Sequence, residues 1–157
     1  MSPAFERLLP RLLALRNFLQ TWLAPLAMLA ARLLVAKVFF VSGWLKFGYV
    51  LHDQVDTLYF LFEDYNVPFL PLKVAAWMGM LGELGFSALV ALGLFARLGA
   101  LGLLVISAVI YSVDGNQFAP YWAAIMAIIV THGPGRLSVD ALLWKRWGGM
   151  SCPTGNE

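Results

Sequence analysis

Residues 26–51 read LAMLAARLLVAKVFFVSGWLKFGYVL, an apolar run with only three basic side chains in it. A helix rises about 1.5 Å per residue, so this run is long enough to cross a hydrocarbon core of about 30 Å with some tilt. The whole chain agrees with a membrane location. Of its 157 residues 61% are hydrophobic and 13% are charged, whereas soluble domains are about 45–50% apolar and about 25% charged.

Three more apolar segments follow, and turn signals set their limits. We expect spans over 72–95, 98–113 and 118–132, separated by breaks at Arg97 and at Asp114-Gly115-Asn116. Gly133-Pro134-Gly135 ends the last of them, and 52–71, which includes an amphipathic stretch, connects the first two. The sequence therefore predicts an all-α integral membrane four-helix bundle over 23–135, with spans at about 26–51, 72–95, 98–113 and 118–132.

The two ends of the chain are expected to lie at the membrane surface. Residues 1–22 set arginines among leucines and aromatic residues, which is typical of an amphipathic helix on an anionic membrane face. Pro25 then indicates a bend or the first turn of a new helix. Ser138 is a candidate N-cap for a short interfacial helix within 136–147. The tail, 148–157, is expected to be disordered.

Basic residues gather on one predicted side of the membrane, while the opposite loops are acidic and have only Lys73 near the membrane edge. The positive-inside rule places the basic side in the cytoplasm, so both termini lie there and the number of spans is even. A net charge of +2 gives no support to a nucleic-acid partner. The residues on the basic side are Arg7, Arg11, Arg16, Arg97, Arg136, Lys145 and Arg146.

Four ionisable residues fall inside predicted spans: Arg32, Lys37, Lys46 and Glu83. Each costs roughly 2.5–3.5 kcal/mol near the bilayer centre unless it finds a partner or water. Arg32 and Lys46 share one face of their helix, and Lys37 lies on another. Glu83 is the expected counter-charge for the face that Arg32 and Lys46 share. Lys37 matches Glu83 in predicted depth and Arg32 could reach it, so the nearest basic partner stays open.

Glu83 has three interpretations at this point: an ion-pair staple, a proton-handling group, or the anchor of a polar ligand site. A metal or haem centre is not expected. The two histidines, His52 and His132, fall at opposite membrane faces about 30 Å apart. Cys152 is the single cysteine and forms no CxxC pair. We therefore expect no built-in cofactor.

Six stretches, in their order and spacing, resemble the DoxX family over about residues 28–143. The resemblance implies a small four-helix protein of the bacterial inner membrane. The family takes its name from a quinol-oxidase subunit, and relatives are associated with membrane oxidoreductase complexes and with oxidative or metal stress. The stretches that carry it are 31–34, 39–46, 63–68, 82–84, 92–97 and 133–140.

The resemblance also carries over particular residues. Arg32, Lys46, Glu83 and Arg97 match charged positions that recur in the family, whereas Lys37 matches none. The family's closing motif corresponds to a second set of residues near the end of the last span. Membership alone does not establish catalysis. The closing set is Gly133, Pro134, Gly135, Ser138 and Asp140.

The favoured hypothesis is a membrane component of a redox or stress-response complex, whose charged site holds a quinone, another polar ligand or a partner subunit. A small transporter, or an accessory protein for transport or metal handling, is the first alternative, although no inverted repeat supports it. A structural assembly factor is the second. We expect a membrane subunit or accessory protein rather than a stand-alone enzyme. The bilayer and a partner membrane or redox protein are its expected neighbours, and homo-oligomerisation stays open.

Overall fold

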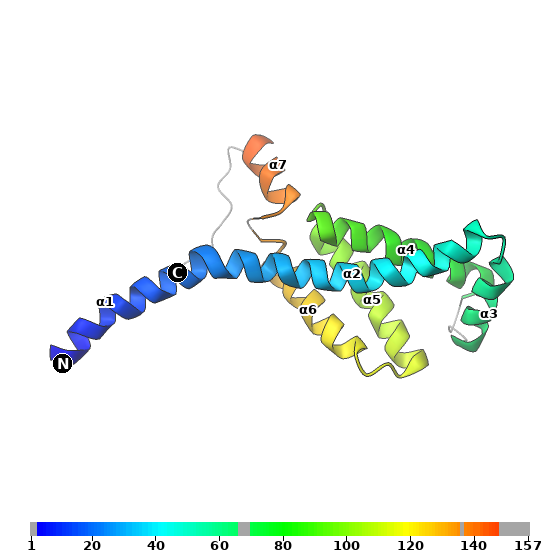
Figure 1. Ribbon diagram of the computed structural model, residues 1–157, viewed down its shortest axis with the longest axis horizontal. Helices are drawn as coiled ribbons and strands as arrows, with labels where there is room; N and C mark the ends of the chain where they lie inside the picture. Colours follow the sequence, from blue (N-terminus) through cyan, green and yellow to red (C-terminus); the bar gives the residue numbers. More distant parts are fainter. Residues whose placement is uncertain (1–2, 66–69, 136, 148–157) are drawn as a thin grey trace.

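The computed structural model describes residues 3–65, 70–135 and 137–147 (Figure 1), so the predicted disordered tail lies outside the described residues. Within them all regular structure is helical, which confirms the all-α prediction. The helices are α1 Pro3–Phe18, the π-helical turn η1 Leu19–Leu23, α2 Ala24–Leu51, α3 Val55–Tyr65, α4 Leu72–Leu92, α5 Ala96–Asp114, α6 Ala119–His132 and α7 Val139–Trp147.

Among the described residues, three helical segments are long and apolar enough to cross a membrane: Pro10–Leu51, Leu72–Leu92 and Ala96–Val113. They support the membrane helical bundle that the composition predicts. The fourth expected span corresponds to α6, an apolar helix of 14 residues. Its length is about 21 Å, which is short for a hydrocarbon core of about 30 Å. A full crossing by α6 stays a prediction.

The N-terminal helix continues into the first span without a break. Figure 1 shows α1 and α2 as one long rod, joined through η1. Pro25 lies in the first turn of α2, directly after the π-helical turn η1, so the backbone hydrogen bond that its missing N–H cannot make falls at this junction. The sequence left two possibilities for this proline, a bend or the first turn of a helix, and the structure has the second. A position of 1–22 at the membrane surface stays a prediction.

Helix α2 meets α4 at a glycine. A Cβ atom built on Gly43 would lie 2.9 Å from Cγ of Leu84 and 3.1 Å from Cβ of Glu83. Only a small residue allows two helices to approach so closely, and membrane helices associate through such contacts. Gly43 therefore sets the register of the bundle, with the middle of α4 opposite this part of α2.

The core is divided into two clusters along the bundle. One joins α2, α4, α5 and α6 around Phe39, Leu103 and Met126. The other joins α3 and α4 around Leu58 and Met80, with side chains of α2 packed against it. Among the described residues α5 and α6 add nothing to this second cluster. Figure 1 shows the α5–α6 hairpin running away from α2 and α4 toward that end. We call the end of the bundle where α3 lies the α3 end.

Candidate functional site

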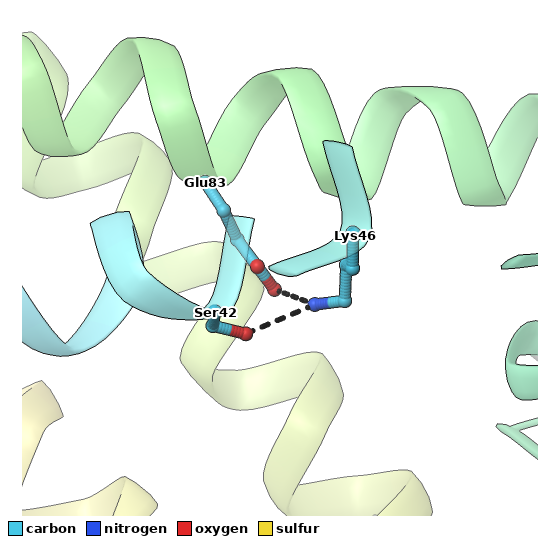
Figure 2. Close-up of polar contacts among 3 residues, drawn as sticks. All are labelled: Ser42, Lys46 and Glu83. Carbon is cyan, nitrogen blue, oxygen red and sulfur yellow. Dashed lines mark hydrogen bonds and ion pairs between the residues drawn. The ribbon is translucent and has the colours of Figure 1, made fainter. Parts of the chain in front are cut away.

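The buried charge cluster is formed by Lys46, Glu83 and Ser42, which we call the polar site (Figure 2). The Lys46 ammonium donates to Oε1 of Glu83 at 2.5 Å and to Oγ of Ser42 at 3.1 Å. Ser42 and Lys46 lie one turn apart on α2, and Glu83 lies in the middle of α4. Glu83 is 2% exposed and Lys46 is 7% exposed. This charge pair is therefore withdrawn from solvent.

The expectation that Arg32 or Lys37 is the nearest basic partner of Glu83 is wrong. It placed the bilayer midplane at the centre of the apolar run, close to Lys37. In the structure, α4 instead crosses α2 near Gly43, about six residues or 9 Å further along α2 than Lys37. Lys46 is one turn beyond that contact and meets Glu83. The first turns of α2 belong to the rod that continues from α1.

One oxygen of the Glu83 carboxylate has no partner. Oε2 is buried and accepts no hydrogen bond in the described structure. Buried carboxylate oxygens are normally satisfied, because an unpaired one retains its full desolvation penalty. Lys46 has three N–H donors, of which two are used, and its ammonium lies 5.8 Å from the centre of the Phe62 ring. The polar site thus retains hydrogen-bonding capacity.

The polar site opens into a cavity of about 480 Å³ among α2, α4 and α5. Its walls are almost entirely apolar, with Lys46, Glu83 and Ser42 as a polar spot on one side. Four aromatic residues line it: Phe39, Phe62, Phe86 and Trp122. Small-molecule sites are typically cavities of about 300–1,000 Å³ with apolar walls and a few convergent polar groups. This cavity has that character.

Arg32 forms a second buried cluster at the other end of the bundle. Its guanidinium donates to the carbonyls of Val90 and Ala91 at 3.1 and 3.0 Å, and to those of Pro134 and Leu137 at 2.7 and 3.2 Å. The first two acceptors end α4, where the helix dipole favours a positive charge. The planar donors of Arg32 therefore join three segments of backbone.

The closing motif completes this second cluster, which we call the latch. Asp140 accepts from the backbone N–H groups of Phe95 and Ala96 at 2.9 and 3.2 Å, at the start of α5. Ser138 accepts from N–H of Ala141 at 3.1 Å, as the expected N-cap does. A Cβ atom on Gly93, whose φ is +70°, would lie 2.6 Å from Cβ of Ser138. The latch comprises Arg32, residues 90–96, residues 133–135 and residues 137–140.

The other predicted site residues lie apart from the polar site. Arg97 is exposed and its guanidinium rests beside Gly133, where a built Cβ would lie 3.2 Å from Nη2. Lys37 is exposed on α2 and lies about 9 Å from Gly43 along the helix. Gly133, Pro134, Gly135, Ser138 and Asp140 belong to the latch.

Sequence reasoning missed Ser42. A serine in a membrane helix is common, and its spacing of one turn from Lys46 is the only signal that marks it. The long-range contacts of Asp140 with Phe95 and Ala96 were also not expected, because they join positions separated by more than 40 residues. Within the described ranges, no group of three or more His, Cys, Asp and Glu residues could hold a metal ion.

Comparison with known proteins gives one result. A sequence model of the DoxX family matches residues 27–117, which is more than half of the chain and includes Arg32, Lys46, Glu83 and Arg97. The closing motif lies beyond the matched part. No curated protein matches the chain, and no solved structure does. On that match, and on an all-helical fold with apolar helices of membrane-spanning length, the chain belongs to the DoxX family.

Proposed function

We propose that this protein is the quinone-binding membrane component of a redox complex, with the polar site as the place where the quinone head is held. One observation carries the proposal. Oε2 of Glu83 is buried without a hydrogen bond beside an apolar cavity of about 480 Å³. A ligand that is mostly apolar and has a polar oxygen at its edge satisfies both features at once.

The chemistry of a quinone suits the residues present. Its ring is flat and apolar, and its carbonyl oxygens accept hydrogen bonds, which the remaining N–H of Lys46 can donate. A quinol has hydroxyl groups instead, and one of them can donate to Oε2 of Glu83. Phe39, Phe86 and Trp122 provide aromatic edges and faces against which a ring packs. One site therefore offers contacts to both forms.

The assembly and the orientation in the membrane belong to the same proposal. Electrons would pass between the bound quinone and a partner redox protein, and this chain would supply the binding site. The exposed basic residues Arg97, Lys145 and Arg146 lie toward the latch end, and exposed acidic residues lie at the α3 end. The positive-inside rule then places the latch end in the cytoplasm of a bacterial cell.

The test is the amount of quinone that copurifies with the protein. The full chain is purified from membranes in mild detergent, and quinones are extracted and quantified by chromatography relative to protein. We expect a stoichiometric fraction with the unaltered chain and at least a tenfold loss with Glu83→Gln. Glu63→Gln is the matched control, because Glu63 is an exposed carboxylate on α3, and it should retain the quinone.

Two results would count against the proposal. Equal quinone content in the Glu83→Gln and Glu63→Gln proteins would remove the polar site from binding. Copurification of a polar solute other than quinone, in stoichiometric amount with the protein, would favour a transporter or an accessory protein for transport instead.

A further inference from the structure

We propose that the polar site exchanges its ligand and its protons only with the α3 side of the membrane. The inference rests on the proposed function for the identity of the ligand. The direction of access rests on the packing of the described residues: among them, the bundle is closed at the latch end and open at the α3 end. One-sided access would make any proton exchange at Glu83 directional across the membrane.

The route toward the latch end is blocked by packed side chains. Phe39 and Trp122 meet edge to face, with ring centres 5.6 Å apart. Phe86 lies against Gly102, where a Cβ atom would approach its ring carbons to 2.5 Å. These three rings form the floor of the cavity. Below the floor lies the first core cluster, in which Leu103 and Met126 are 0% exposed.

The latch closes the same end a second time. Arg32 is 1% exposed, and its four hydrogen bonds hold the end of α4 against Pro134 and Leu137. Native cores pack with few voids larger than a water molecule. A proton or a quinone head would need to break both the aromatic floor and the latch to leave in this direction.

No described residue packs across the route toward the α3 end. The cavity wall continues from Phe86 along α4 and α5 to Leu70 and Asn116, which lie at the far ends of these helices. Leu70, which lines the wall outside the spans, is 42% exposed. The second core cluster receives nothing from α5 or α6 in the described residues, so no packed core joins the hairpin to α3. The cavity therefore reaches the surface here.

Proton exchange follows the same route. When a ligand hydroxyl donates its proton to Oε2 of Glu83, the O–H bond breaks, the new bond forms at the carboxylate, and the ligand oxygen retains the electron pair beside the Lys46 ammonium. The proton then leaves Glu83 for water at the α3 end. Exposed carboxylates of Asp53, Asp56 and Glu63 lie on that side and favour cations near the mouth.

Cysteine accessibility tests the direction. In the full chain carrying Cys152→Ser, single cysteines replace Asn116 at the mouth, Val109 in the wall and His132 at the latch end. A fourth variant, Leu103→Cys, is the matched control on α5, six residues below Val109 and fully buried. Each protein is treated with a charged, membrane-impermeant thiol reagent in vesicles of both orientations.

We expect Asn116→Cys and Val109→Cys to react from one side, His132→Cys from the other, and Leu103→Cys from neither. Reaction of Val109→Cys from the His132 side, or from no side, would overturn the inference. A short-chain quinone added first should slow labelling of Val109→Cys at least fivefold. Loss of that protection alone would reject the quinone and retain the one-sided cavity, so the two proposals fail separately.

Discussion

The two buried cations of this bundle, Arg32 in the latch and Lys46 in the polar site, are used in different ways. Arg32 donates hydrogen bonds to four backbone carbonyls. Lys46 meets a carboxylate whose second oxygen is left without a partner, beside a cavity. A satisfied cluster is complete without a ligand, whereas the polar site is not.

The comparison teaches that burial of a charge does not by itself mark function. Both side chains are nearly inaccessible and both occupy charged positions expected from the family resemblance. The difference lies in their partners. The partners of Arg32 are backbone carbonyls, and removal of its side chain leaves three of them without a donor. Arg32 is therefore part of the fold. The carboxylate partner of Lys46 has a second oxygen that accepts no hydrogen bond from the described residues, and this makes the polar site suited to binding a ligand.

Removal of Arg32 should have the largest effect on stability. Arg32→Met leaves the carbonyls of Ala91, Pro134 and Leu137 without a donor, while that of Val90 keeps the N–H of Gly93. Each unpaired group costs about 1–3 kcal/mol, so we expect a loss of about 5 kcal/mol. Unfolding by sodium dodecyl sulfate in mixed micelles measures it. Arg32→Lys, with fewer donors, should fall between. Lys37→Met is the exposed control and should stay within about 0.5 kcal/mol; equal stability of Arg32→Met and this control would refute the role of the latch.

Breaking the Lys46–Glu83 pair should come next, and it should be reversible by a second change. Lys46→Met leaves an unpaired buried carboxylate, which costs about 3–5 kcal/mol, whereas replacing both partners by apolar residues is often neutral. The double variant Lys46→Met with Glu83→Leu should therefore recover the stability of the unaltered chain while binding no quinone. Unfolding midpoints and bound quinone are measured on the same samples.

The double variant also tests the difference between Lys46 in the polar site and Arg32 in the latch. No side-chain replacement can rescue Arg32→Met, because its partners are main-chain carbonyls. A double variant that remains as unstable as Lys46→Met would show that the polar site, like the latch, is structural.

Substitution of a glycine at the cavity floor should have a smaller, local effect on stability. Gly102→Ala forces Phe86 to move, since the new Cβ would lie 2.5 Å from the ring, and overpacking of this kind costs about 1–3 kcal/mol. Gly85→Ala is the matched control. It also lies within a helix but has nothing within 4 Å of its built Cβ, so it should gain up to about 1 kcal/mol. Equal midpoints for the two variants would refute the packed floor.

The smallest effect is expected at the end of the latch. Asp140→Asn retains one acceptor oxygen but loses the charge that strengthens both hydrogen bonds at the start of α5. A loss of about 1 kcal/mol is expected, typical of a weakened helix cap. Asp53→Asn, an exposed carboxylate at the α3 end, should change the unfolding midpoint by less than half as much. The reverse order would remove Asp140 from the latch.

The fold was largely predictable from local signals. Long apolar runs predict the helices, and Gly115 and Gly133 end α5 and α6 because helices often end at a residue in or near the left-handed region. The buried position of Glu83 followed from its place in the middle of a span. These features depend on residues close together in the chain, so sequence patterns contain them.

The pairing of charges was not predictable. It depends on the register between α2 and α4, which is set by the contact of Gly43 with Leu84 and by the continuation of α1 into α2. The middle of the apolar run is therefore not the middle of the bundle. The latch likewise joins residues 32, 90 and 134, whose proximity is a property of the packed structure. Neither hydropathy nor helical periodicity contains that information.

The most direct test of the polar site as a ligand site is an equilibrium titration. The full chain in lipid nanodiscs is titrated with a short-chain quinone, and saturable quenching of tryptophan fluorescence is followed, since Trp122 lines the cavity. We predict saturable binding that survives Glu63→Gln and weakens at least tenfold in Glu83→Gln. Identical binding curves for these two variants, or no saturable binding by the unaltered chain, would contradict the account.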